Sequence, residues 1–343
     1  MGTLVLRSSN VKNGEIVDAD NVYVNDKVAT SENVQVGDII VVVRNGSRAL
    51  IGKHAQIKAS MPNTVIGAFM SGIRSGQSSF VNALLDTSAF ENEIAKNMGA
   101  TINQITGYMF SKMEFMVPSE EEQQQIGQYF SNLDHLITLH QRKCDETKKL
   151  KKFMLQKMFP KKDEKKPEIR FAGFTDDWEQ RKLVDVVDVR SGRDYKHLEE
   201  GDIPVYGTGG YMLSVNEALS DDEDAIGIGR KGTIDNPYIL RAPFWTVDTL
   251  FYAVPLDKYD LNFVFDIFQN VNWKAKDEST GVPSLSKATI NAVETLMPEY
   301  AEQKKIGEYF SNLDNFITLH QRKCDEIKKI KKFMLQNMFP QKG

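Results

Sequence analysis

Residues 121–160 read EEQQQIGQYFSNLDHLITLHQRKCDETKKLKKFMLQKMFP, and residues 301–340 read AEQKKIGEYFSNLDNFITLHQRKCDEIKKIKKFMLQNMFP. The two stretches align at an offset of 180 without a gap, and 31 of these 40 positions are identical. A repeat of this length indicates an internal duplication and sets the organisation of the whole chain. Because each copy follows a segment of different sequence, the chain alternates between a variable segment and a repeated one.

Each copy of the repeat has the pattern of one long helix. Apolar residues recur in alternating steps of four and three, which is the spacing of a coiled-coil seam. Ser119 and Glu122 form a predicted capping box before the first helix, and Pro160 and Pro340 mark the two helix ends. About 40 residues at roughly 1.5 Å each give a helix of roughly 60 Å. The expected seam residues are Ile126, Phe130, Leu133 and Ile137 in the first copy and Ile306, Phe310, Leu313 and Ile317 in the second.

Polar residues of the repeat leave alternatives open. His140 and Cys144 are one turn apart, as are His320 and Cys324. In an antiparallel helix pair these four side chains could meet as a zinc-like ligand set, although His and Cys at seam positions more often fill the seam and fix its register. Lysines near the end of each copy could contact phosphates or form a solvated helix face. They are Lys148, Lys149, Lys151 and Lys152, repeated as Lys328, Lys329, Lys331 and Lys332.

The variable segments are predicted to be mixed domains. Strand patterns, rich in β-branched residues, occur at 22–24 and 39–43 in the first segment, and at 203–206, 225–228, 238–240 and 250–254 in the second. Helical patterns occur at 80–96 and 261–271. The expected fold class is α+β, with two mixed domains joined by two long antiparallel helices in a pseudo-two-fold repeat. We expect a first domain at 1–118, a first helix at 119–160, a linker and second domain at 161–298, and a second helix at 299–343.

The two domains are expected to be distant relatives. Residues 38–46 (DIIVVVRNG) align with residues 224–232 (DAIGIGRKG) at an offset of 186, and each stretch has an acid, a strand, an arginine and a glycine turn. Since this offset is close to that of the helices, the duplication is predicted to include the domains. On this alignment the first domain lacks a counterpart of residues 170–178, so we expect it to be short at its N-terminal end.

The composition is that of an ordinary globular protein, with 41% hydrophobic and 26% charged residues among 343. The net charge of −4 argues mildly against nucleic-acid binding, although the local distribution of charge matters more than the sum. The two cysteines occupy the same repeat position, and such sparse use fits a reducing cytosol. No apolar run is long enough to span a membrane, and the N-terminus lacks the pattern of a signal peptide. We therefore expect a cytoplasmic protein without a membrane partner.

Motifs for catalysis are weak or missing. Residues 227–232 match the pattern GxGxxG, but a dinucleotide site needs a helix there and the sequence continues with the turn-forming residues TIDNP. We expect instead a tight turn that presents Arg230 and Lys231 to a phosphate chain, or else a plain solvated turn. Residues 236–238 match only part of the Asn-Pro-Pro-Tyr motif of amino-methyltransferases, and there is no P-loop or convincing nuclease set. The chain is therefore predicted to be non-catalytic, with no cofactor or metal of its own.

The order of these parts resembles the specificity subunit of type I restriction-modification systems. The resemblance covers nearly the whole chain and is carried by Pro-x-x-x-Glu-Gln before each repeated helix, the helices themselves, residues 170–178 and residues 281–287 (GVPSLSK). It implies two target recognition domains, each of which reads one half of a split, asymmetric site in double-stranded DNA. It also implies that the helices act as a spacer and bind two modification (methyltransferase) subunits. Restriction subunits, which are ATP-dependent translocases and nucleases, would join them. S-adenosylmethionine, ATP and Mg are implied for those partner subunits and not for this chain.

The residues expected to contact DNA lie in turns beside predicted strands, where polar groups could meet base edges and cations could meet phosphates. The alternative is a helical scaffold or interaction protein without sequence-specific DNA binding, which the acidic net charge favours. The candidates are Arg44, Arg48 and Lys53 in the first domain and Arg190, Arg193, Lys196, Tyr206, Thr208, Arg230 and Lys231 in the second.

Overall fold

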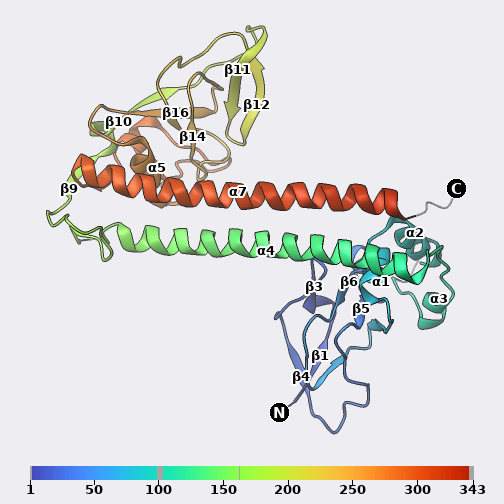
Figure 1. Ribbon diagram of the computed structural model, residues 1–343. Coiled ribbons are helices and arrows are strands. Elements are labelled where there is room, and N and C mark those ends of the chain that lie inside the picture. The colour runs from blue at the N-terminus through green and yellow to red at the C-terminus, as the bar shows by residue number, and fades with distance from the viewer. Residues whose placement is uncertain (1, 99–102, 162, 340–343) are drawn as a thin grey trace. The chain divides into compact units, whose positions relative to one another are not determined.

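The computed structural model describes residues 2–98, 103–161 and 163–339. The chain divides into two units, Met1–Arg142 with Gln321–Gly343 and Lys143–His320, so the boundary crosses both repeated helices. These helices are α4 (Glu120–Met158) and α7 (Tyr300–Met338) (Figure 1). Each has 39 residues, which corresponds to about 58 Å and confirms the prediction of two long helices.

In both units a half of α4 packs against a half of α7. Within each unit, residues later in α4 contact residues earlier in α7. The halves therefore run antiparallel, as predicted. The contacts that fix this direction are Asp134–Lys331 and Ile137–Cys324 in the first unit, and Lys151–Asp314 and Cys144–Ile317 in the second.

The first unit contains small sheets and short helices. Its strands are β1 (Thr3–Leu6), β2 (Val11–Lys12), β3 (Glu15–Ile16), β4 (Val22–Val24), β5 (Ile39–Val42), β6 (His54–Gln56), β7 (Thr64–Ile66) and β8 (Met70–Ile73). Its short helices are α1 (Ser78–Leu85), α2 (Ser88–Asn97) and α3 (Gly107–Ser111). One sheet has the order β4-β1-β7, in which β1 pairs parallel with β7 and antiparallel with β4. A second, antiparallel sheet has the order β6-β5-β8, and β2 pairs with β3.

The second unit is built in the same way. Its strands are β9 (Glu179–Lys182), β10 (Val187–Ser191), β11 (Glu200–Gly207), β12 (Gly210–Val215), β13 (Ala225–Gly229), β14 (Tyr238–Leu240), β15 (Trp245–Thr246), β16 (Leu250–Pro255) and β17 (Glu294–Met297). Its short helices are α5 (Leu261–Asn270) and α6 (Lys287–Asn291). The sheets have the orders β12-β11-β15 and β10-β16-β13-β14, and β9 pairs with β17.

The two units share one topology, so the duplication includes the domains. Sheet β4-β1-β7 corresponds to β12-β11-β15, because in both the central strand pairs parallel with a later strand and antiparallel with its other neighbour. Sheet β6-β5-β8 corresponds to β14-β13-β16. The alignment of residues 38–46 with residues 224–232 therefore joins equivalent strands, β5 and β13. The second unit adds β10 at the edge of β16, and β9 beside β17.

One glycine in each long helix lets a domain helix pack closely against it. A β-carbon on Gly127 of α4 would lie 2.6 Å from the backbone nitrogen of Phe80 in α1. A β-carbon on Gly307 of α7 would lie 2.8 Å from the backbone nitrogen of Phe263 in α5. Real β-carbons are not found at such distances, so a side chain at either position would push the domain helix away. Figure 1 shows α5 lying beside the first half of α7.

The prediction of a single helix at residues 80–96 is wrong, because the structure has two helices, α1 and α2, with a break at Asp86 and Thr87. The hydroxyl of Thr87 donates to the carbonyl of Leu84 at 2.6 Å and accepts the N–H of Phe90 at 3.4 Å. Thr87 therefore ends one helix and caps the next. The predicted cap of α4 is present in part, since the N–H of Glu122 donates to the hydroxyl of Ser119 at 3.4 Å.

Candidate nucleic-acid interface

An exposed turn follows β13 in the second unit. It consists of Arg230, Lys231 and Gly232, and Gly232 has a left-handed φ of +99°. Gly229 is required before the turn, because a β-carbon there would lie 1.9 Å from the carbonyl oxygen of Thr233. The next element is the strand β14 and not a helix. The GxGxxG pattern therefore forms a cation-bearing turn and not a dinucleotide site.

A second segment holds this turn in place. The N–H of Gly232 donates to the carbonyl of Pro283 at 2.8 Å, and the N–H of Leu285 donates to the carbonyl of Arg230 at 2.9 Å. Lys231 also forms a β-bridge with Ser284. Between the turn and this segment lies an open groove of about 520 Å³. It is lined by Ser191, Arg230, Lys231, Phe251, Ser284, Leu285, Ser286 and Lys287.

An equivalent turn follows β5 in the first unit. Arg44 forms a β-bridge with Gln104, and the N–H of Ile105 donates to the carbonyl of Val43 at 2.8 Å. When the alignment of the two helices is extended towards the N-terminus, Gln104 and Ile105 correspond to Ser284 and Leu285. The two turns are therefore held by corresponding segments.

The arginine of each turn also lies against a ring. The Arg44 guanidinium is 4.9 Å from the ring centre of Phe69, and that of Arg230 is 5.8 Å from the ring centre of Phe251. Each unit therefore presents an exposed arginine on a supported turn.

The remaining first-unit candidates lie in the loop between β5 and β6. Arg48 begins a short 3-10 turn over Arg48–Leu50, and its side chain is exposed. Lys53 is exposed, and its carbonyl accepts the N–H of Val42 at 2.8 Å. Arg44 and Lys53 therefore stand at the two ends of one loop.

Two second-unit candidates stand beside the Arg230 turn. A β-carbon on Gly232 would lie 3.9 Å from the hydroxyl oxygen of Thr208. Tyr206 is half-buried, and its ring centre is 6.0 Å from that of Tyr238. The hydroxyl of Tyr238 donates to the carbonyl of Gly207 at 2.5 Å, and burial raises its pKa. This bond supports the hairpin between β11 and β12 that carries both candidates.

The other basic candidates of the second unit differ in their partners. Arg193 and Lys196 are exposed, and the backbone N–H of Arg193 donates to the carbonyl of Thr246 at 2.8 Å. Arg190 instead donates to Glu223 and to Asp188, the latter at 2.6 Å. These two carboxylates raise the pKa of Arg190 and accept hydrogen bonds from much of its guanidinium group.

Four polar residues of the groove were not among the predicted candidates: Ser191, Ser284, Ser286 and Lys287. The sequence GVPSLSK is visible, but it lies far along the chain from the Arg230 turn, and no local pattern indicates that they meet. The β-bridge between Lys231 and Ser284, with the backbone hydrogen bonds beside it, brings these cations and hydroxyls into one groove.

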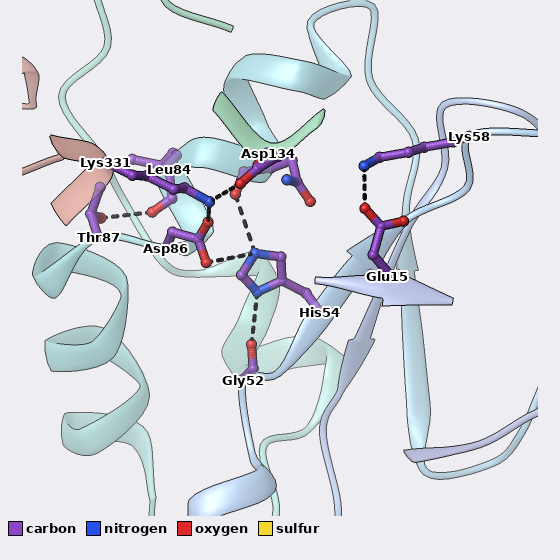
Figure 2. Close-up of polar contacts among 10 residues, drawn as sticks. Glu15, Gly52, His54, Lys58, Leu84, Asp86, Thr87, Asp134 and Lys331 are labelled. Atoms are coloured by element: carbon purple, nitrogen blue, oxygen red, sulfur yellow. Dashed lines mark hydrogen bonds and ion pairs between the residues drawn. The ribbon is translucent and has the colours of Figure 1, made fainter. Parts of the chain in front are cut away.

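A lysine of the long helices, largely removed from solvent, joins the helices to the domain in each unit. Figure 2 shows Lys331 of α7 between Asp134 of α4 and Asp86, at 2.6 Å from each, with His54 on the other side of Asp86. In the second unit Lys151 of α4 contacts Asp314 of α7 and, at 2.6 Å, the side-chain oxygen of Gln269 in α5. The prediction of a solvated helix face is therefore wrong for Lys151 and Lys331, because acidic or amide groups hold each lysine from two directions.

The repeated helices bury one set of apolar residues and expose another. Of the predicted seam residues, Ile126, Phe130, Ile306, Phe310 and Leu313 are buried within their own units, and Leu133, Ile137 and Ile317 are partly buried. Exposed apolar residues occur at equivalent positions of the two copies. The pairs are Leu136 with Phe316, Leu150 with Ile330, and Phe153 with Phe333.

The two cysteines of the repeated helices lie in the buried contact between α4 and α7. Cys144 and Cys324 are both buried, and each sulfur lies 3.9 Å from a backbone carbonyl of the other helix. Within residues 2–98, 103–161 and 163–339, no group of three or more His, Cys, Asp or Glu side chains is arranged to hold a metal ion.

Across the described part of the chain, no helix is both long and apolar enough to cross a membrane.

Comparison with known proteins gives consistent matches. The model of the family "Type I restriction modification DNA specificity domain" matches twice, at residues 5–149 and 175–329. The specificity subunit of the type I restriction enzyme MjaVIII of Methanocaldococcus jannaschii is 25% identical over 280 residues, which are 69% of this chain and 64% of that protein. The EcoKI specificity subunit of Escherichia coli strain K12 is 27% identical over 134 residues, 38% of this chain and 29% of that protein. The chain therefore spans less than two thirds of the length of these curated relatives.

A solved structure shares the fold. The crystal structure of the type I restriction-modification S subunit from M. genitalium has a TM-score of 0.72 to this chain at 17% identity, over 100% of this chain and 93% of that one. At this identity the match establishes the architecture of two domains and two long helices.

Proposed function

Because the chain belongs to the family of type I restriction-modification DNA specificity domains, we propose that it selects the DNA target of a type I restriction-modification complex. The target is double-stranded DNA with two separate half-sites, and each unit reads one of them. Two modification subunits bind the repeated helices, and restriction subunits complete the assembly.

The observation that carries this proposal is the pair of equivalent arginine turns. Arg44 and Arg230 are exposed, follow equivalent strands and are held by equivalent segments. Arginine on a supported turn suits guanine edges and phosphates, because its planar donors are fixed in direction. The residue after each arginine differs, Asn45 in one unit and Lys231 in the other. Such differences suit two half-sites of different sequence.

The DNA-binding residues of the second unit divide into two classes. Arg230, Lys231, Arg193 and Lys196 are exposed, and we assign them to DNA together with Lys287 of the same groove. Arg190 is already bound by Asp188 and Glu223, so we assign it to the support of β10 and not to a phosphate. Tyr206 and Thr208 are placed on the β11–β12 hairpin as candidates for contacts with base edges.

Binding of two modification subunits is supported by the exposed apolar residues of the helices. Large apolar side chains exposed at matching positions are typical of a protein interface. The first unit offers Leu136, Ile330 and Phe333, and the second unit offers their counterparts Phe316, Leu150 and Phe153. Since the two sets are related by the repeat, two copies of one partner can bind in the same manner.

Catalysis belongs to the partners in this proposal. S-adenosylmethionine is used by the modification subunits, and ATP and Mg by the restriction subunits. The chain itself acts by binding, and it works in the bacterial or archaeal cytoplasm, where its DNA target is found.

The test is DNA binding by the complex of this chain with its modification subunits. The double variant Arg230→Ala/Lys231→Ala is expected to weaken specific binding by about 1–3 kcal/mol for each lost base contact. It should also reduce the dependence of affinity on salt, because fewer phosphates are neutralised. Lys258→Ala, an exposed lysine outside the groove, is the control. Equal specific binding by the double variant and the control would favour a scaffold without DNA specificity.

A further inference from the structure

The turn after β5 in the first unit carries an asparagine whose side chain is fixed in direction. The side-chain oxygen of Asn45 accepts the N–H of Ser47 at 2.9 Å, and its side-chain nitrogen donates to the hydroxyl of Ser8 at 3.0 Å. Because the N–H of Ser47 can only donate, the atom that faces it is the oxygen, which distinguishes the two ends of the carboxamide. Asn45 is half-buried and directly follows the exposed Arg44.

A neighbouring segment also holds the backbone around Asn45. The N–H of Asn45 donates to the carbonyl of Asn103 at 3.3 Å, and the side chain of Asn103 donates to the carbonyl of Gly46 at 3.0 Å. Arg44 forms the β-bridge with Gln104. A ligand that binds Asn45 therefore meets a carboxamide that is already oriented, which lowers the entropic cost of binding.

The Asn45 carboxamide keeps half of its hydrogen-bonding capacity. A carboxamide has two N–H groups and two lone pairs on its oxygen. Ser8 and Ser47 use one of each, and among the described residues the other N–H and the other lone pair have no partner. The side chain can therefore donate one bond and accept one bond at the same time.

One donor beside one acceptor is the pattern that matches adenine in the major groove. The adenine edge presents the N7 acceptor and the N6 amino donor, which a single carboxamide can bind together. Guanine presents two acceptors, N7 and O6, so it leaves the carboxamide oxygen without a donor. Because the side chain is neutral, its contribution is to the choice of sequence and not to the attraction for phosphates.

The second unit has a different group in this place. Ser8 follows β1 and Thr208 follows β11, and these are the corresponding central strands. Thr208 lies beside Gly232 of the second turn, as Ser8 lies beside Asn45 of the first. A hydroxyl is therefore next to both turns, but Lys231 stands in place of Asn45. Since a lysine side chain has donors and no acceptor, the two turns suit different bases.

On the basis of the proposed function, we propose that Asn45 reads an adenine of the half-site bound by the first unit, through N7 and N6 in the major groove. Ser8 is a positioning residue, because its hydroxyl holds the carboxamide in one orientation. The half-site of the first unit therefore contains an A·T pair whose recognition depends on Asn45.

The test uses the complex of the full chain with its modification subunits and a duplex that carries the methylated motif. The half-site of the first unit is the one that Arg230→Ala/Lys231→Ala leaves unchanged. Each adenine of this half-site is replaced in turn by 7-deazaadenine, which lacks the N7 acceptor and keeps the Watson–Crick edge. At one position the wild type should lose affinity about fivefold or more, because one bond of a bidentate pair is removed.

Variants of Asn45 should not respond to this replacement. Asn45→Ala should bind the unmodified duplex about tenfold or more weakly than the wild type, and 7-deazaadenine should weaken it no further. Asn45→Asp keeps the acceptor for the N–H of Ser47 and loses the donor to N7, so it should be insensitive as well. The dependence of affinity on salt should equal that of the wild type, because no cation is lost.

The role of Ser8 has its own readout. Ser8→Ala should lower the preference for adenine over the other bases at the sensitive position, and Ser8→Thr, which keeps the hydroxyl, should restore it. A wild-type preference in Ser8→Ala would overturn the positioning role.

Asn25→Ala is the matched control. The side-chain oxygen of Asn25 also accepts the N–H of the residue two positions later, Lys27, at 2.9 Å, so the same local bond is removed. Asn25 lies at the other end of β1, since Val24 pairs with Thr3 whereas Ser8 follows the last residue of the strand. Its affinity and its response to 7-deazaadenine should be those of the wild type.

Three results would overturn the assignment of Asn45 while the proposed function stands. They are an equal response of Asn45→Ala and the wild type to 7-deazaadenine, the absence of any sensitive adenine, and a half-site without an A·T pair. A methylated motif that does not depend on the chain would instead contradict the proposed function itself.

Discussion

Lys331 of α7 donates to Asp134 of α4 at 2.6 Å in the first unit. The corresponding residues of the repeat, Lys151 and Asp314, form the same cross-helix pair in the second unit at 2.5 Å. Each lysine interrupts the apolar seam and reaches a domain residue as well, Asp86 or Gln269. A single charged side chain therefore fixes both the register of the helix pair and the position of a domain on it.

Removal of this lysine should destabilise its unit. Lys331→Met leaves the partly buried carboxylates of Asp134 and Asp86 without a cation, which costs about 1–3 kcal/mol. The free energy of unfolding in urea gives the measurement. The neighbouring Lys332→Met is the control, because Lys332 is exposed. If both variants lose the same small amount, the lysine does not hold the helices and domain together.

The two helix glycines should not tolerate alanine. Gly127→Ala and Gly307→Ala each place a methyl group within 3 Å of the backbone of the adjacent domain helix. We expect a loss of about 1–3 kcal/mol in unfolding free energy, although alanine is the better helix former. Gly107→Ala should be neutral, because no heavy atom lies within 4 Å of the added carbon. A gain in stability at Gly127 would contradict the close packing of α1 on α4.

Asp266 should make stability depend on pH. Burial raises the pKa of this carboxyl well above its ordinary value. An acid with a raised folded pKa keeps its proton in the folded state, so its contribution to stability is full below about pH 4 and is lost as the pH rises. Asp266→Asn cannot ionise, so its stability relative to the wild type should improve as the pH rises from 5 to 8.

Thermal unfolding across this pH range checks the effect of Asp266. Asp257→Asn, an exposed residue of the same unit, provides the control. A constant difference between Asp266→Asn and the wild type from pH 5 to pH 8 would show that Asp266 is ionised in the folded protein.

The exposed rings of the helices should determine how many modification subunits bind. Phe333→Ser changes one of the two equivalent sets and Phe153→Ser changes the other. Each single variant is expected to bind one modification subunit and the double variant none, as measured by native mass spectrometry. Lys152→Ser, an exposed position next to Phe153, should still bind two. Two subunits bound by the double variant would remove the helices from the interface.

The sequence predicts the repeated and strongly patterned parts of the molecule well. The helices and their antiparallel packing follow from the long repeat, and the relation between β5 and β13 follows from the weaker match of residues 38–46 with residues 224–232. The break at Thr87 is not predicted, because one hydroxyl ends the helix without disturbing its apolar pattern. The groove is predicted only in part, since Arg230 has a local turn signal and Lys287 is brought to it by long-range bridging.

The roles of Lys151 and Lys331 could not be read from the sequence for a similar reason. A lysine in a polar stretch normally indicates a solvated face, and only the packing of a second helix and a domain against it changes that expectation. Arg190 is the converse case, because the sequence predicts that it contacts DNA from a turn, whereas it lies in β10 and is already bound by Asp188 and Glu223.

In the proposed function, this chain chooses the DNA sequence that its complex modifies. The most direct measurement is a genome-wide map of methylated adenines in cells that have the chain, lack it, or carry Arg230→Ala with Lys231→Ala. We expect a methylated motif of two half-sites that disappears without the chain, and that loses or relaxes one half-site in the double variant. Identical methylation maps with and without the chain would contradict it.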